Sequence, residues 1–313
     1  MSDATSNHDR LAADSFRRSR GRWRIVALVL AIVAVLALVG RFALFEPPQD
    51  AHVARITLAG TIGTDAQRMA LIEKLIEDDS VKAVIVAINS PGGTTAGGEE
   101  LYEGLRRLAE AKPTISVIRE LGASAAYMSA IATDRIFARR LSIVGSIGVL
   151  YQHFNAGKLL DTIGIDLDKV ASGPLKAEPD YDEPLEGAVR ASIGELVQDS
   201  FAWFVDIVAE RRNMPRAAVL ALADGRIVTG RQGVENGLVD AIGGEHEAMA
   251  WLAAEKGIAQ DMPVVSVWPL PQGQFDWLGE LIGGSARGAL GLPVEGPVVL
   301  DGLVSLWQVG QTP

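Results

Sequence analysis

Two residues that could act as a nucleophile and a base stand in glycine-containing segments of this chain. Ser124 lies in the string Gly-Ala-Ser-Ala-Ala-Tyr at 122–127, at the predicted first turn of an alanine-rich helix over 123–133. The positive end of a helix dipole stabilises negative charge that develops on such a serine. Lys176 ends the string Ser-Gly-Pro-Leu-Lys at 172–176. A lysine that loses its proton when desolvated can act as general base for a serine hydroxyl.

Each of these residues also has a simpler interpretation. Ser124 fits an ordinary N-cap, which is a far commoner role for a serine at a helix start than nucleophile. Lys176 fits a solvated loop lysine, although the chain has 22 arginines and only seven lysines. Taken one at a time, the residues leave both alternatives open.

A third segment could supply backbone hydrogen-bond donors. The string Asn-Ser-Pro-Gly-Gly at 89–93 follows a β-branched run over 81–88 that predicts a buried strand. At the carboxyl end of a parallel strand, backbone N–H groups are free to point at a ligand, and glycine lets the backbone approach closely. The alternative is a plain strand-to-helix turn.

The composition excludes several other chemistries. The chain has no cysteine, so it has no thiolate nucleophile, disulfide or cysteine-ligated metal. Its four histidines do not show the spacing of a helical zinc motif; they are His8, His52, His153 and His246. We therefore expect no metal and no cofactor. The net charge of −10 also argues against a nucleic-acid partner.

The amino-terminal region combines arginines with an apolar run. Residues 1–24 carry six arginines and three aspartates, and no residue in 25–40 is charged. Apolar residues resume after Arg41, so we expect residues 25–45 to cross the inner membrane once, as a transmembrane anchor in the lipid bilayer. The arginine-rich tail then stays in the cytoplasm, and the linker 46–51 leads to a catalytic domain in the periplasm or another extracytoplasmic space. The alternative is a cleaved signal peptide.

Strand and helix patterns alternate over residues 52–257, which we expect to form one domain. The run 81–88 predicts a strand, whereas the apolar spacing over 65–78 and 97–111 predicts helices. This order predicts an α/β fold built from parallel βαβ units. Residues 258–313 are expected to add a strand and an apolar tail, either a packing arm or a contact with the membrane or a neighbouring subunit.

Five strings, in the same order along the chain, resemble those of the signal peptide peptidase A family. They are Asn-Ser-Pro-Gly-Gly at 89–93, Gly-Ala-Ser-Ala-Ala-Tyr at 122–127, Val-Gly-Ser-Ile-Gly-Val at 144–149, Ser-Gly-Pro-Leu-Lys at 172–176, and Thr-Gly-Arg-Gln at 229–232 with Gly-Leu-Val-Asp-Ala-Ile-Gly at 237–243. The resemblance implies a Ser–Lys serine protease of the crotonase-like and Clp-protease-like ββα superfold. The single domain resembles the short form of the family.

The resemblance also implies roles for individual residues. Ser124 matches the nucleophile, Lys176 the general base, and Ser146 the serine that orients the lysine amine. The backbone N–H groups of Gly93 and Ala125 match the oxyanion hole. The family assembles its active sites between neighbouring catalytic domains, so a single-domain chain implies a homo-oligomer with Ser124 and Lys176 on different protomers.

The chain departs from the family pattern at several positions. Ala125 and Ala126 replace the usual glycines after the serine, and Leu175 replaces the usual aromatic residue before the lysine. The segment after the lysine is also acidic, with Asp180, Asp182 and Glu183. Nearby carboxylates would raise the pKa of the lysine and oppose its role as a base, unless they point to solvent.

The expected activity is that of a membrane-anchored serine endopeptidase that cuts apolar peptides such as signal peptide remnants. One rival is an envelope quality-control protease of the same fold, and another uses His153 as the base in a Ser–His pair. The non-enzymatic rival is a membrane-anchored scaffold without turnover. An acyl-CoA enzyme of the same superfold is disfavoured, because acyl-CoA is cytoplasmic whereas the catalytic domain is expected outside the cytoplasm.

Overall fold

The computed structural model describes residues 26–34, 50–269 and 304–306. The chain divides into two compact units, Met1–Asp50 and Ala51–Pro313.

The first unit contains a short helix over residues 26–34, whose valine, leucine and isoleucine side chains are exposed. In the part of the chain that the structure describes, no helix is both long and apolar enough to cross a membrane. Most of the predicted anchor over 25–45 lies outside the described residues.

The second unit is built on a sheet that has nine strands among the described residues. The strands are β1 (His52–Ile62), β2 (Val81–Thr94), β3 (Thr114–Ala123), β4 (Arg135–Ala138), β5 (Ile143–Gly145), β6 (Ile227–Thr229), β7 (Ala241–Ile242), β8 (Val264–Trp268) and β9 (Val304–Leu306). Their order is β6-β5-β3-β2-β1-β8, with β4 between β3 and β7 and with β9 on β2. Only β6 and β9 pair antiparallel. The prediction of an α/β fold with a mainly parallel sheet is confirmed.

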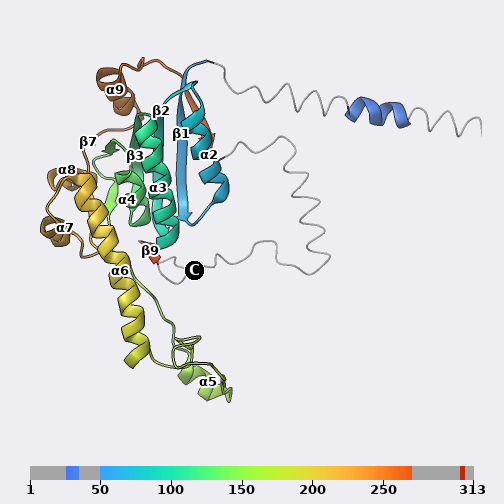
Figure 1. The fold of residues 1–313 in the computed structure, drawn as a ribbon, viewed down its shortest axis with the longest axis vertical. Helices are drawn as coiled ribbons and strands as arrows, with labels where there is room; N and C mark the ends of the chain where they lie inside the picture. Colours follow the sequence, from blue (N-terminus) through green and yellow to red (C-terminus); the bar gives the residue numbers. More distant parts are fainter. Residues whose placement is uncertain (1–25, 35–49, 270–303, 307–313) are drawn as a thin grey trace, which may run out of the picture. The chain divides into compact units, whose positions relative to one another are not determined.

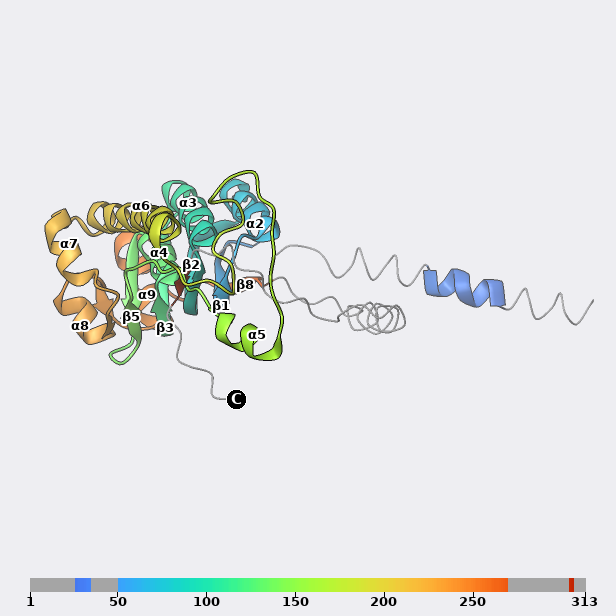
Figure 2. The ribbon, with the colours of Figure 1, turned by 90° about the horizontal axis from the view of Figure 1, so that it is seen from below.

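Helices pack on both faces of this sheet (Figure 1). They are α2 (Ala66–Glu77), α3 (Thr95–Ala111), α4 (Ala125–Ile131), α5 (Gly157–Ile163), α6 (Gly187–Arg212), α7 (Arg216–Leu222), α8 (Gly230–Glu235) and α9 (Glu245–Lys256). Helices α2, α3, α4 and α6 share one hydrophobic core with the sheet, and α9 shares a second. Figure 2 shows α2, α3 and α6 along one side of the strands.

The β-branched run in β2 serves both cores because side chains alternate across a strand. Val84, Val86 and Ile88 belong to the core under α2, α3, α4 and α6, whereas Ala83 and Ile85 belong to the core under α9. Burial on both faces explains why this strand is continuously apolar in the sequence.

The string at 89–93 is part of β2, so the expectation that the strand ends at residue 88 and that the string follows it is wrong. Ser90 pairs with Gly122 of β3, and Gly93 pairs with Ile62 of β1. Neighbours on both sides hold this segment extended, although glycine and proline disfavour strands when judged locally.

Residues 148–203 form an arm that buries none of its own residues. From Gly148 to Trp203 every side chain is at least partly exposed, whereas the preceding Ile147 and the following Phe204 are fully buried. The arm consists of residues 148–156, α5, the loop after it and α6 as far as Trp203. In Figure 1 the arm projects beyond the end of the sheet.

The carboxyl-terminal half of α6 holds α4 in place. Arg211 donates from Nε to the backbone oxygen of Ile131 at 2.9 Å and from Nη2 to that of Thr133 at 3.1 Å. The last carbonyls of a helix have no partner within the helix, so this guanidinium satisfies groups that burial would otherwise leave unpaired.

We expect Arg211→Met to lower the free energy of unfolding by about 1.5–3 kcal/mol, because hydrogen bonds from a charged donor to two buried carbonyls are lost. Chemical denaturation measures this change. The matched control is Arg216→Met, since Arg216 pairs with Asp206 where both side chains are more than half exposed, and its loss is expected to cost less than about 1 kcal/mol. Equal effects of the two substitutions would contradict this role of Arg211.

Candidate active site

The parallel register of β3 and β5 places two predicted site residues side by side. Ala123 pairs with Gly145, and the next residue on each strand is Ser124 on one and Ser146 on the other. The N–H of Ser124 donates to the oxygen of Gly145 at 2.8 Å. Both serines therefore lie at the carboxyl edge of the sheet, where open α/β sheets bind their ligands.

Ser124 has a backbone conformation that non-glycine residues rarely adopt. Its φ is 59° and its ψ is −123°, on the turn that joins β3 to α4, and the residue is 1% exposed. The serine precedes the first residue of α4 but its side chain makes no N-cap hydrogen bond, so the ordinary N-cap interpretation does not describe it. Strained conformations of this kind cluster at functional sites, and a sharp strand-to-helix turn is also the geometry that presents the nucleophile in many serine hydrolases.

Gly93 lies at the same edge, on β2, in very close contact with β1. A Cβ atom at this position would fall 1.7 Å from the backbone oxygen of Ile62. The preceding Gly92 has a φ of +105°, which side chains disfavour. Both glycines are therefore required by the backbone. The close contact is with strand β1, and the expected approach of this backbone to a ligand stays a prediction.

Ala125, the other predicted oxyanion residue, is fully buried at the start of α4. A Cβ atom at Gly98 of α3 would lie 3.0 Å from the Ala125 Cβ and 2.8 Å from the Met128 Sδ. Gly98 thus leaves the space that the methyl group of Ala125 occupies. The departure from the family pattern at Ala125 is accommodated by its neighbour, and the backbone N–H at 125 is retained.

Ser146 is also held in a restricted conformation. Its φ is 51°, it is 8% exposed, and its N–H donates to the backbone oxygen of Arg226 at 2.8 Å. The position next to Ser124 suits the predicted role of orienting a lysine amine at the nucleophile.

Lys176 is not part of this cluster within the protomer. It lies in the loop between α5 and α6, on the exposed arm, and its side chain is exposed. In Figure 1 this loop lies beside α5, beyond the end of the sheet. The structure therefore brings together Ser124, Ser146, Gly93 and Ala125, but places the predicted base on a different part of the molecule.

Two of the acidic residues near Lys176 pair with a different lysine. Lys169 forms ion pairs with Glu178 and Asp180. The hydrogen bonds that Lys169 donates to Asp180, and to a lesser degree to Glu178, raise the pKa of Lys169 above its ordinary value. In the described part of the chain, no carboxylate forms an ion pair with Lys176.

His153, the rival base, lies on the arm as well. Its Nε2 is 2.9 Å from the backbone oxygen of Glu183. A base in a Ser–His pair needs a carboxylate to orient it, and here the ring contacts a backbone carbonyl instead. The arrangement gives the Ser–His alternative no support.

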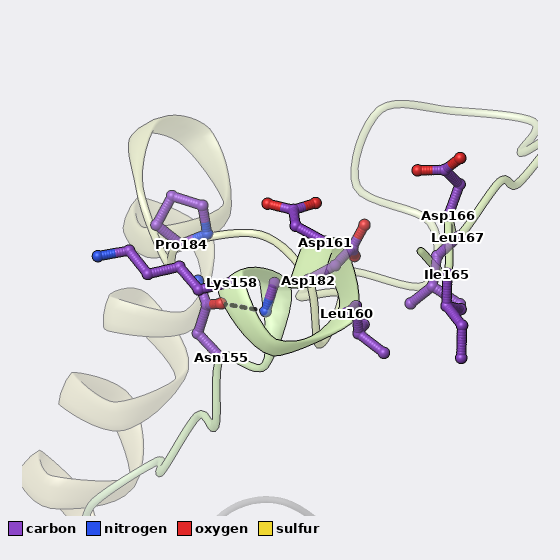
Figure 3. Close-up of a pocket in the computed structure, with 10 residues that line it drawn as sticks. Asn155, Lys158, Leu160, Asp161, Ile165, Asp166, Leu167, Asp182 and Pro184 are labelled. Carbon is purple, nitrogen blue, oxygen red and sulfur yellow. Dashed lines mark hydrogen bonds between the residues drawn. The ribbon is translucent and has the colours of Figure 1, made fainter. Parts of the chain in front are cut away.

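The arm also carries a pocket of about 570 Å³ that holds none of the predicted site residues (Figure 3). It is lined by aspartates and by apolar side chains of α5 and the adjoining loops, and the side chain of Asn155 accepts a hydrogen bond there from the N–H of Gly157 at 2.8 Å. This pocket is separate from the cluster around Ser124.

A buried serine lies on a strained strand-to-helix turn, at the same sheet edge as two glycines that the backbone requires. This arrangement is typical of a serine hydrolase. Comparison with known proteins gives the family. The model of peptidase family S49 matches residues 106–259, a range that includes Ser124, Ser146 and Lys176. The chain belongs to peptidase family S49 and is a serine endopeptidase.

Relatives agree with this assignment. A candidate protease of Synechocystis sp. is 34% identical over 218 residues, which cover 69% of this chain and 79% of that protein. A candidate signal peptide peptidase SppA of Enterococcus faecium is 37% identical over 188 residues, 59% of this chain and 54% of that protein. The chloroplastic serine protease SPPA of Arabidopsis thaliana is 34% identical over 187 residues, 58% of this chain and 27% of that protein. The match thus spans about half of the Enterococcus protein and about a quarter of the Arabidopsis protein.

Sequence reasoning missed Gly98, whose importance is visible only from the packing of α3 on α4. The pair Gly97-Gly98, in the first turn of α3, was the available signal, because glycine weakens a helix and its presence often has a packing reason.

We expect Gly98→Ala to lower the free energy of unfolding by about 1–3 kcal/mol through overpacking against Ala125 and Met128. Ala125→Gly in the same chain removes one of the two crowded atoms, so the double variant is expected to recover part of the loss. Denaturation of the single and double variants measures the coupling. Purely additive effects would contradict the contact between positions 98 and 125.

Proposed function

We propose that this chain is a membrane-anchored endopeptidase of the Clp-protease-like and crotonase-like superfold, in which Ser124 of one protomer works with Lys176 of a neighbour. One observation carries the proposal. Within one protomer, the site around Ser124 is already formed, but Lys176, the proposed base, lies on a different part of the molecule. Ser124 is buried in the body on a strained turn, and Lys176 is exposed on an arm without buried residues.

The arm has the surface of an interface. Its exposed apolar side chains include Leu150, Phe154, Leu159, Ile163, Ile165, Leu167, Val170, Leu175 and Tyr181. Exposed apolar surface of this extent marks contact sites on soluble domains. A second copy of the chain is the partner that would both cover these residues and carry Lys176 to a serine.

The chemistry then follows the residues at the carboxyl edge of the sheet. The neutral amine of Lys176, oriented by Ser146, takes the proton of the Ser124 hydroxyl as the serine oxygen attacks the peptide carbonyl. The N–H groups of Gly93 and Ala125 donate to the oxyanion, a contribution of about 10² to 10³ in rate for each donor in related chemistry. The lysine ammonium then gives this proton to the nitrogen of the leaving peptide as the C–N bond breaks and the acyl-enzyme forms. The amine, neutral again, activates a water molecule that hydrolyses the acyl-enzyme.

The β2 edge supports extended peptides as substrates. Residues 304–306 of this chain already lie antiparallel to Gly92, Gly93 and Thr94 as strand β9. Strand addition of this kind lets the backbone of a peptide supply affinity without a fixed sequence. We assign apolar peptides such as signal peptide remnants as the substrate class, in keeping with the name of the Enterococcus relative.

The anchor is part of the proposal. Residues 26–34 are helical with exposed apolar side chains, and uncharged residues extend this segment over 25–40. With the arginines of 1–24 in the cytoplasm, residues 25–45 would hold the peptidase domain at the outer surface of the inner membrane.

Mixing two inactive variants tests the shared site. Ser124→Ala and Lys176→Ala are each expected to lose activity on a fluorogenic apolar peptide. Co-expressed at equal levels, they are expected to regain about a quarter of the wild-type rate, since half of the protomers keep the serine and half keep the lysine.

The control co-expresses Lys176→Ala with the double variant Ser124→Ala/Lys176→Ala in place of Ser124→Ala. No protomer in this mixture has an intact Lys176, so no activity is expected to return. Mixed oligomers that form but stay inactive would refute a site shared between protomers. Full activity of Ser124→Ala alone would refute the nucleophile.

Strand β9 generates a separate prediction, because it occupies the edge assigned to the substrate. Ser305→Pro removes a backbone N–H from this short strand in the full chain. We expect the KM for an extended peptide to fall about three- to tenfold with kcat unchanged, because more of the protein has a vacant edge. Steady-state kinetics measures both constants. An unchanged or higher KM would contradict competition between β9 and the substrate at this edge.

A further inference from the structure

Ser90, in the string at 89–93, makes hydrogen bonds that its place in a strand does not require. The residue is fully buried. Its Oγ donates to the backbone oxygen of Gly60 at 2.6 Å and accepts from the N–H of Gly92 at 3.1 Å. One hydroxyl thus connects β1 to the end of β2.

These bonds occur where the regular ladders are interrupted. The register between β1 and β2 shifts between Ala59 and Thr61, and the register between β2 and β3 shifts between Ile88 and Ser90. Irregular pairing leaves backbone groups without ladder partners, and burial makes an unpaired group costly. The Ser90 hydroxyl satisfies one carbonyl and one N–H at this point.

The same hydroxyl bears on the orientation of the next peptide group. Its single proton goes to Gly60, so the bond that restrains Gly92 is the one its Oγ accepts from the Gly92 N–H at 3.1 Å. The backbone oxygen of Gly92 lies on the same side, 3.5 Å from the Oγ. That oxygen and the N–H of Gly93 belong to one planar trans peptide, so they point in opposite directions. With the Gly92 oxygen turned toward Ser90, the Gly93 N–H is turned away from it.

A glycine pair needs such a restraint. Gly92 pairs with β1 and β9, but its φ of +105° lies in a region that glycine enters readily, so no side chain of its own confines its backbone. If the peptide between Gly92 and Gly93 rotated, its carbonyl oxygen would take the place of the Gly93 N–H. The carbonyl oxygen would then face the position where the negative charge of the oxyanion develops.

We propose that Ser90 is a positioning residue for the oxyanion hole, whose hydroxyl holds the Gly92–Gly93 peptide with its N–H toward the reacting carbonyl. This inference rests on the proposed role of Gly93. It adds a side chain that touches neither substrate nor nucleophile and acts through the backbone of its neighbours.

The test compares Ser90→Ala with Ser142→Ala in the full-length chain. Ser142 is a matched control, since its Oγ also bridges backbone groups, accepting from Arg139 at 3.0 Å and donating to Arg119 at 2.7 Å, and it is 2% exposed. Its bonds join the turn before β5 to the middle of β3, and none of them reaches Gly92 or Gly93. Both variants lose a buried bridging hydroxyl, but only one loses it beside Gly93.

For Ser90→Ala we expect kcat on the apolar peptide to fall about 10- to 100-fold with KM within about twofold, because an oxyanion donor acts in the transition state and not in substrate binding. A peptide aldehyde, which forms a tetrahedral adduct with the serine, is expected to bind more weakly by a similar factor. Ser142→Ala is expected to keep kcat and aldehyde affinity while losing similar thermal stability.

Several outcomes would overturn the proposal. They are a folded Ser90→Ala with wild-type kcat, an equal loss of kcat in both variants, or a loss that appears in KM alone. If Ser90→Ala does not fold, Ser90→Cys carries the same test, because a thiol keeps a weaker donor and acceptor at this position. A reduced kcat with unchanged KM then supports the role, and a wild-type kcat refutes it.

The result is separable from the fate of the proposed function. Loss of activity in Ser124→Ala together with full activity in Ser90→Ala refutes the positioning role alone. Full activity in Ser124→Ala refutes the nucleophile itself.

Discussion

The hydrogen bond from the N–H of Ser124 to the oxygen of Gly145 is the constraint on which the site depends. It extends the β3–β5 ladder beyond the Ala123–Gly145 pair, at a residue whose φ of 59° is costly without glycine. The fully buried residues at the start of α4 follow at once, so the turn has no room to relax. Parallel pairing of β1, β2, β3 and β5 then brings the glycine backbone of β2 to the same edge.

The body and the arm of the protomer divide the proposed chemistry between them. In the body, packing is close enough that a methyl group at Gly98 or Gly93 meets its neighbours. In the arm, 56 consecutive residues from Gly148 to Trp203 contain none that is buried. A rigid body suits a nucleophile and oxyanion donors, which must keep their geometry before substrate arrives. An arm with exposed apolar side chains suits assembly, so under the proposed function the base reaches the serine only when protomers join.

Much of the fold and part of the site follow from the sequence for identifiable reasons. The β-branched run of β2 and the alternation of strands with helices predict a parallel sheet, and glycine-containing strings then fall at the carboxyl ends of the strands. The conformation of Ser124 could not be predicted, because a positive φ at a non-glycine residue leaves no signature in the residue type. The extension of β2 through 89–93 was missed because its stability comes from neighbouring strands and not from local propensity. The separation of Lys176 from Ser124 within one protomer agrees with what the family resemblance implies, although the order of the strings alone does not reveal it.

The distance between the Ser124 Oγ and the Lys176 Nζ in the assembled oligomer tests the central claim most directly. An experimental structure of the full-length protein in membrane-mimetic solution would provide it. We predict a separation of about 3 Å between atoms of neighbouring protomers, which is hydrogen-bond distance. Lysine amines that remain in solvent in the assembled protein, or another side chain in contact with Ser124 as its base, would contradict the account.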